Sequence, residues 1–193
     1  MNKYLCCVTV LLMAFAVALP VSPGLAAEKE WKDLKKDEKR EKIDARAATN
    51  LEALLAKSPK AAELYDMAYG WAAFHNLKLA VGVTAGGGKG VAVSKSTEDS
   101  VYMEMATVGV GASLGGQKYD VIFFFETEEH LRKFVNDGWE ANASANAAGW
   151  KSGVNKQTNF INGLVIYQMT DGGLMVNADI AGTKYWKDGN LND

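Results

Sequence analysis

The chain has 193 residues, of which 48% are hydrophobic and 23% are charged, and its formal net charge is −2. This composition is too apolar for a disordered protein and too poor in long apolar runs for a protein with several membrane-spanning helices. The near balance of charge also argues against a nucleic-acid-binding protein that relies on general positive charge.

The first 27 residues are typical of a secretory signal peptide. Lys3 provides a positive start, and residues 5–19 form an apolar run. These fifteen residues are fewer than the roughly 20 that cross a bilayer as a helix, so an uncleaved anchor is the less favoured alternative. Small residues at 24–27 predict cleavage after Ala27 or Ala26. We therefore expect an exported protein, located most simply in the periplasm.

Both cysteines of the chain, Cys6 and Cys7, lie inside this segment. They stand near the start of the apolar run, whereas a lipoprotein carries its acylated cysteine at the end of such a run. The mature chain would then have no thiol, which excludes disulfides, cysteine nucleophiles and thiolate metal sites.

Residues 28–57 are predicted to form a charged amphipathic helix. Its first part is rich in Lys, Arg and Glu, which are good helix formers, and opposite charges recur three or four residues apart. The spacing of one buried stripe then appears at Ile43, Ala47, Leu51, Leu54 and Leu55. Ser58 can cap a second helix that begins with Pro59 and runs to about Tyr69. We therefore place the start of the main domain at residue 58 and its end at residue 193.

Alternating and continuous apolar runs predict strands after residue 70. The predicted strands cover residues 77–83, 90–94, 101–114 and 119–125. Glycines predict turns at 86–88 and 115–116, so the first two strands would form a hairpin.

A helix over 127–135 interrupts the strands. Thr127 is its expected cap, Gly138 ends it, and its inward side chains are Leu131, Phe134 and Val135. A final hairpin is predicted from strands at 163–169 and 174–180. Together the elements predict an α+β domain in which N-terminal helices pack on a curved, mostly antiparallel, glycine-rich sheet that partly closes into a barrel.

Residues that could carry chemistry are sparse. The glycine cluster fails as a phosphate-binding loop, because Gly90 stands where Ser or Thr is needed and Val83 where the first glycine is needed. His75 and His130 lack a paired metal-ligand spacing, so His75 is expected to satisfy a local hydrogen bond and His130 to be solvated. No nucleophile–base pair can be assembled. We therefore expect no cofactor, no nucleotide, no metal and no catalytic residue.

A tryptophan among lysines indicates contact with a membrane surface, since the ring suits headgroup depth while lysines meet phosphate. Neighbouring acidic residues weaken this attraction, which amounts to about 1 kcal/mol per lysine near an anionic surface. The candidate lipid-contact residues are Trp31, Lys32, Lys35, Lys36, Lys39, Arg40 and Lys89.

The order of motifs between residues 69 and 192 resembles the SYLF family, whose eukaryotic members bind phosphoinositides and actin filaments. The matching segments are 70–74, 86–93, 109–117, 120–125, 167–174 and 179–182. Two segments depart from the family pattern: Phe74–His75 replaces a Phe-Pro pair, and residues 101–105 replace a Trp-Ser-Pro stretch. The resemblance implies a non-enzymatic lipid-associating module, which in some members is preceded by an amphipathic helix that reaches the membrane.

The export signal and the resemblance together predict an exported lipid-binding module at the cell envelope. Its expected partner is an anionic phospholipid surface or an apolar, lipid-like ligand. The alternative is an envelope protein–protein interaction module, in which the charged helix binds a partner chain and no lipid is bound.

Overall fold

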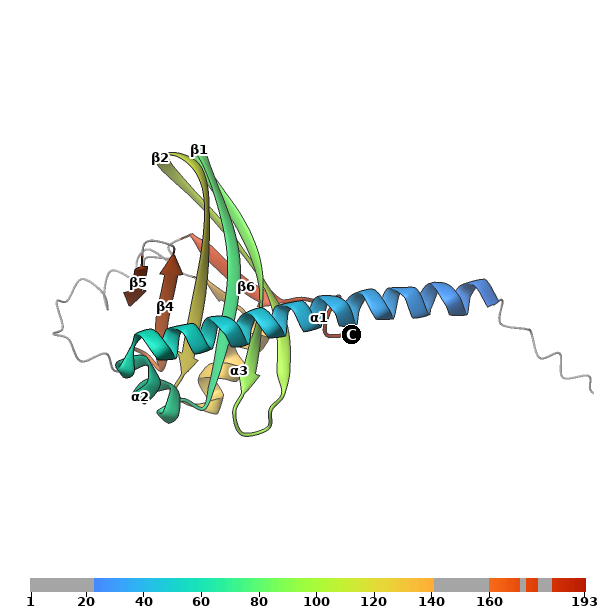
Figure 1. The fold of residues 1–193 in the computed structure, drawn as a ribbon, viewed down its shortest axis with the longest axis horizontal. Helices are drawn as coiled ribbons and strands as arrows, with labels where there is room; N and C mark the ends of the chain where they lie inside the picture. The colour runs from blue at the N-terminus through green and yellow to red at the C-terminus, as the bar shows by residue number, and fades with distance from the viewer. Residues whose placement is uncertain (1–22, 141–159, 171–172, 177–181) are drawn as a thin grey trace, which may run out of the picture. The chain divides into compact units, whose positions relative to one another are not determined.

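Two helices open the described part of the chain in the computed structural model, and strands with one further helix follow (Figure 1). The structure describes residues 23–140, 160–170, 173–176 and 182–193. The elements are α1 (Pro23–Lys57), α2 (Pro59–Met67), β1 (Gly70–Ser94), β2 (Ser100–Phe125), α3 (Glu128–Asp137), β3 (Trp139–Glu140), β4 (Leu164–Thr170), β5 (Gly173–Val176) and β6 (Thr183–Lys187). Most of the predicted signal peptide lies outside the described residues, and its cleavage stays a prediction.

The helices form close to where the sequence predicts them, but α1 begins at Pro23, five residues before its predicted start at residue 28, and ends at Lys57 as predicted. Ser58 caps α2, because its side-chain oxygen accepts a hydrogen bond of 3.1 Å from the Ala61 amide. Thr127 likewise caps α3 by accepting from the amide of His130, and Gly138, with φ of 73°, ends that helix. α2 stops at Met67, slightly earlier than expected.

Strands β1 and β2 form one long antiparallel hairpin, which corrects two predictions. The predicted turns at 86–88 and 115–116 are wrong, because both segments lie inside strands. The chain reverses between β1 and β2 instead. Their register runs from Gly70 opposite Phe125 to Val93 opposite Ser100.

Glycines in β1 allow the two halves of this strand to approach each other closely. The register shifts between Val81 and Val83, and there the hairpin bends (Figure 1). Beyond the bend, β1 lies over its own first half, so that a Cβ added at Gly86 would meet the carbonyl oxygen of Leu77 at 2.8 Å. A glycine has no Cβ, and it therefore allows the two segments to pack with their backbones in contact.

Further strands extend both halves of the hairpin. β4 pairs with the second half of β2, and β5 pairs with β4. β6 pairs with the first half of β2, and β3 pairs with β6. The β4–β5 hairpin confirms the prediction as far as residue 176, while residues 177–180 lie outside the described residues. The sheet is antiparallel and curls into a half-barrel with helices packed on it, which confirms the α+β fold class.

Two apolar clusters lie on opposite faces of the sheet. On the inner face Phe123 packs against Phe134 of α3 and against Tyr185 of β6, with ring centroids 5.0 Å apart in each pair. The outer cluster joins the buried stripe of α1 and the apolar side of α2 to the sheet; its members include Ala47, Leu51, Leu54, Leu64, Ile122 and Phe124. The strand over 119–125 is therefore covered on both faces, as its continuous apolar run predicts.

Candidate functional site

The charged part of α1 separates its charges by sign. Successive residues of an α-helix advance by about 100°, so residues that alternate in sequence fall on different faces. One half of the helix surface holds Lys35, Lys36, Lys39 and Arg40, and the other half holds Asp37, Glu38 and Glu41. Lys35 and Lys39 are exposed, and Lys36 is partly buried. We call Lys35, Lys36 and Lys39 the cationic face of α1.

Two further candidates, Trp31 and Lys32, precede this face in α1. Their side chains lie outside what the structure describes. Their predicted contact with lipid therefore stays a prediction.

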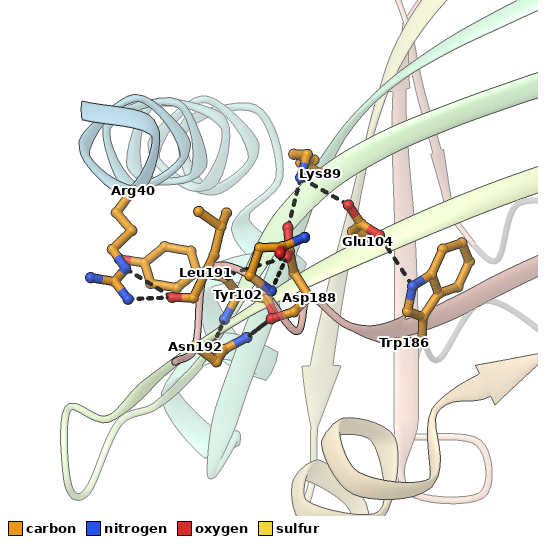
Figure 2. A network of polar contacts seen from close by, with 9 residues as sticks. Arg40, Lys89, Tyr102, Glu104, Trp186, Asp188, Leu191 and Asn192 are labelled. Carbon is orange, nitrogen blue, oxygen red and sulfur yellow. Dashed lines mark hydrogen bonds and ion pairs between the residues drawn. The ribbon is translucent and has the colours of Figure 1, made fainter. Parts of the chain in front are cut away.

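Arg40 is occupied by contacts within the protein (Figure 2). Its Nε donates a hydrogen bond of 2.8 Å to the carbonyl oxygen of Leu191, in the C-terminal segment. Its guanidinium also lies 5.7 Å from the centroid of the Tyr102 ring, whose hydroxyl donates to Asp44 at 2.8 Å. Arg40 thus fastens α1 to β2 and to the end of the chain, which is a structural role that the sequence did not indicate.

Lys89 is held by two carboxylates. Its Nζ donates to Asp188 at 2.6 Å and to Glu104 at 2.8 Å, and Glu104 also accepts from the indole of Trp186 (Figure 2). The Asp188 side chain is only 1% exposed. Burial tends to raise the pKa of Asp188, but the hydrogen bonds from Lys89 and from nearby amides outweigh it and hold that pKa below the ordinary value. The positive charge of Lys89 is therefore compensated inside the fold.

The two histidines also have local partners. The Nδ1 of His75 lies 2.7 Å from a carboxylate oxygen of Asp120, which is the satisfied contact that the sequence predicts. His130 differs from expectation: its Nδ1 lies 2.8 Å from the Thr127 hydroxyl, and its ring packs against Gly163 where a side chain would stand. Within the described ranges, no group of three or more His, Cys, Asp or Glu side chains is arranged to hold a metal ion.

Exposed apolar side chains near the bend of the β1–β2 hairpin were missed by the sequence analysis. Leu77 exposes 43% of its surface, Leu79 55% and Val108 67%. Alternation of apolar residues is an ordinary signal of a half-buried strand, so it gave no warning that these three side chains are exposed among the described residues. One signal was available: the segments 79–88 and 105–117 contain no charged residue.

A shallow pocket of about 210 Å³ lies between α3 and the turn that joins β1 to β2. Tyr69, Ala92, Val101, Leu131 and Arg132 are among its lining residues. Pockets that enclose a drug-sized ligand measure about 300–1,000 Å³. This pocket is therefore small for a lipid-like ligand.

Among the described helices, none has the length and apolarity to cross a membrane.

Comparison with known proteins supports the resemblance. Residues 106–193 match the model of the family described as Ysc84, Las17-binding protein actin regulator. The chain is also similar to Beta cell expansion factor A of Aeromonas veronii, with 34% identity over 172 residues. That alignment covers 87% of this chain and 66% of the relative. The chain thus spans just under two thirds of its relative's length, and both matches are consistent with the SYLF family, also called Ysc84.

Proposed function

We propose that this protein is an exported, non-catalytic module that associates with anionic phospholipid surfaces at the cell envelope. The cationic face of α1 is the observation that carries the proposal. The ion pairs described in α1 join Asp37 to Arg40 and Glu38 to Lys42, so they leave Lys35 and Lys39 directed to solvent. The similarity to the SYLF family, which the resemblance associates with lipid, supports a lipid partner.

The separation of charges on α1 preserves an attraction to anionic surfaces that evenly mixed charges would cancel. Each lysine at an anionic membrane surface contributes about 1 kcal/mol, and the effect decays within a Debye length of about 10 Å at 0.1 M salt. The helix diameter is about 10 Å, so the acidic half of α1 lies roughly one Debye length farther from a membrane that the cationic face touches. The lysines consequently dominate the interaction at moderate ionic strength.

Vesicle flotation tests the proposal. The triple variant Lys35→Glu, Lys36→Glu, Lys39→Glu should lower binding to vesicles that contain phosphatidylglycerol by on the order of a hundredfold, since three contributions of about 1 kcal/mol are lost or reversed. A matched control reverses three exposed lysines elsewhere, Lys57, Lys133 and Lys187, and changes the net charge equally. Equal loss in both variants would show a net-charge effect and contradict a site on α1.

The same experiment distinguishes the alternative functions. A protein-interaction module without a lipid ligand would leave the wild-type chain at the bottom of the gradient with every vesicle. A carrier of an apolar ligand would release lipid on denaturation in mass spectrometry, and its binding would not respond to the triple reversal. Cell fractionation with sequencing of the N-terminus tests export: a mature chain beginning at Ala27 or Glu28 supports it, and an intact N-terminus in the cytoplasm contradicts it.

A further inference from the structure

We infer that the bent end of the β1–β2 hairpin inserts into the interfacial layer of an anionic bilayer. This inference rests on the proposed function and assigns to it a second contact, separate from α1. We call the bent end, residues 77–88 and 105–118, the hairpin end. Its exposed apolar side chains are Leu77, Leu79 and Val108.

These side chains continue a face of the sheet that is covered elsewhere. Leu77 and Leu79 lie on the same face of β1 as Ala73, which is buried beneath α1 and α2. The polar His75, paired with Asp120, stands between Ala73 and Leu77. On β2, Val108 shares a face with Tyr102, which packs in that cluster, and Glu104, paired with Lys89, lies between them. Beyond these two polar pairs, the outer face is apolar again at Leu77, Leu79 and Val108, where the helices do not cover it. A strand that faces water on one side normally alternates to polar residues there, so the hairpin end has the composition of a covered surface.

The charges around the hairpin end favour a membrane as that cover. No acidic residue occurs in the segments 76–88 and 105–119, which contain only the lysines Lys78 and Lys118. Lys118 lies opposite Leu77 in the register, and Lys78 lies opposite Gln117. An anionic lipid surface complements this pair of lysines. Two copies of the chain joined end to end would instead place the same lysines near one another, which is unfavourable.

The dimensions also agree with shallow insertion. The hairpin bends where the register shifts between Val81 and Val83, about four residues beyond Lys78. At about 3.3 Å per residue this distance is about 13 Å. Apolar faces of interfacial segments bury about 5–10 Å into the boundary of headgroups and acyl chains, and the hydrocarbon core is about 30 Å thick. The hairpin end can thus place Leu79 and Val108 below the headgroups while Leu77, Lys78 and Lys118 stay near phosphate depth, without crossing the bilayer.

A pair of matched variants tests the inference. Leu79→Asp changes an exposed apolar side chain at the hairpin end, and Met67→Asp changes one at the end of α2; the two wild-type residues are 55% and 60% exposed. Flotation with vesicles of phosphatidylglycerol and phosphatidylcholine should fall on the order of tenfold for Leu79→Asp and stay at the wild-type level for Met67→Asp. Both sites are on the surface, so thermal unfolding should confirm that both variants remain folded.

A polarity-sensitive fluorophore gives an independent reading. It is attached to Leu79→Cys or Met67→Cys in a chain in which Cys6→Ser and Cys7→Ser remove the native thiols. The emission of the label at position 79 should shift to shorter wavelength when anionic vesicles are added, and the emission of the label at position 67 should not. If the wild type floats but Leu79→Asp floats equally and the label does not shift, the inference is wrong and the proposed function remains. If the wild type does not float, both are wrong. A blue shift that depends on protein concentration without vesicles would identify a second copy as the cover and overturn the inference.

Discussion

Substitution of Gly90 by alanine tests the close packing of β1 on itself. A Cβ at Gly90 would lie 2.5 Å from Cδ1 and 2.7 Å from Cγ of Phe74, and it would also meet the carbonyl oxygen of Ala73. Phe74 is fully buried in the inner cluster, and a backbone carbonyl cannot rotate away. Overpacking of this kind costs about 1–3 kcal/mol. We expect Gly90→Ala to lower the free energy of unfolding toward the upper end of that range.

Gly87→Ala is the matched control. Both glycines lie in β1, but a Cβ at Gly87 would have one neighbour within 4 Å, the carbonyl oxygen of Met105 at 3.5 Å. This variant should unfold at the wild-type urea midpoint, or at a slightly higher one because alanine restricts the unfolded chain. Urea titrations followed by circular dichroism measure the difference. Equal midpoints for the two variants would refute the proposed contact between the two halves of β1.

Three further variants or titrations probe the caps and buried groups. Asp188→Asn should lower the free energy of unfolding by about 2 kcal/mol near neutral pH. Because hydrogen bonds from Lys89 and neighbouring amides depress the pKa of Asp188, its contribution is present above the unfolded-state pKa of about 3.9 and is lost as pH falls, so the difference from wild type should vanish in acid urea titrations. Ser58→Ala should cost about 1 kcal/mol by removing the cap of α2, which thermal melts can detect, and an unchanged melt would argue against the cap. Burial raises the pKa of Tyr102, Tyr119 and Tyr167 to about 12 and that of Tyr185 well above its ordinary value, so stability should decline as pH rises above about 10, and ultraviolet titration should show four tyrosines ionising late; early ionisation of all tyrosines would contradict their burial.

The sequence predicts the local elements of this fold well. The caps Ser58 and Thr127 and the stripe of α1 follow from short-range rules, and the structure confirms each of them. The glycines at 86–88 and 115–116 were misread, because a glycine that allows a turn also allows two backbones to touch. Which of these applies depends on a partner segment elsewhere in the chain, and a local pattern contains no information about it.

The candidate site shows the same division. The cationic face of α1 could be found from helix geometry once the helix was predicted, since the separation of charges depends only on residue spacing. The sequence could not predict that Arg40 and Lys89 make their contacts within the protein and not with lipid. Their partners Leu191 and Asp188 lie near the other end of the chain. β6 was missed for a similar reason. It is short and partly polar, and it becomes a strand by pairing with β2.

Salt-dependent flotation of the mature, wild-type protein tests the central claim most directly. The protein should float with vesicles that contain phosphatidylglycerol at low ionic strength, detach progressively as salt shortens the Debye length, and remain at the bottom with pure phosphatidylcholine. Equal flotation with both kinds of vesicle, or flotation with neither, would contradict an association directed by anionic headgroups.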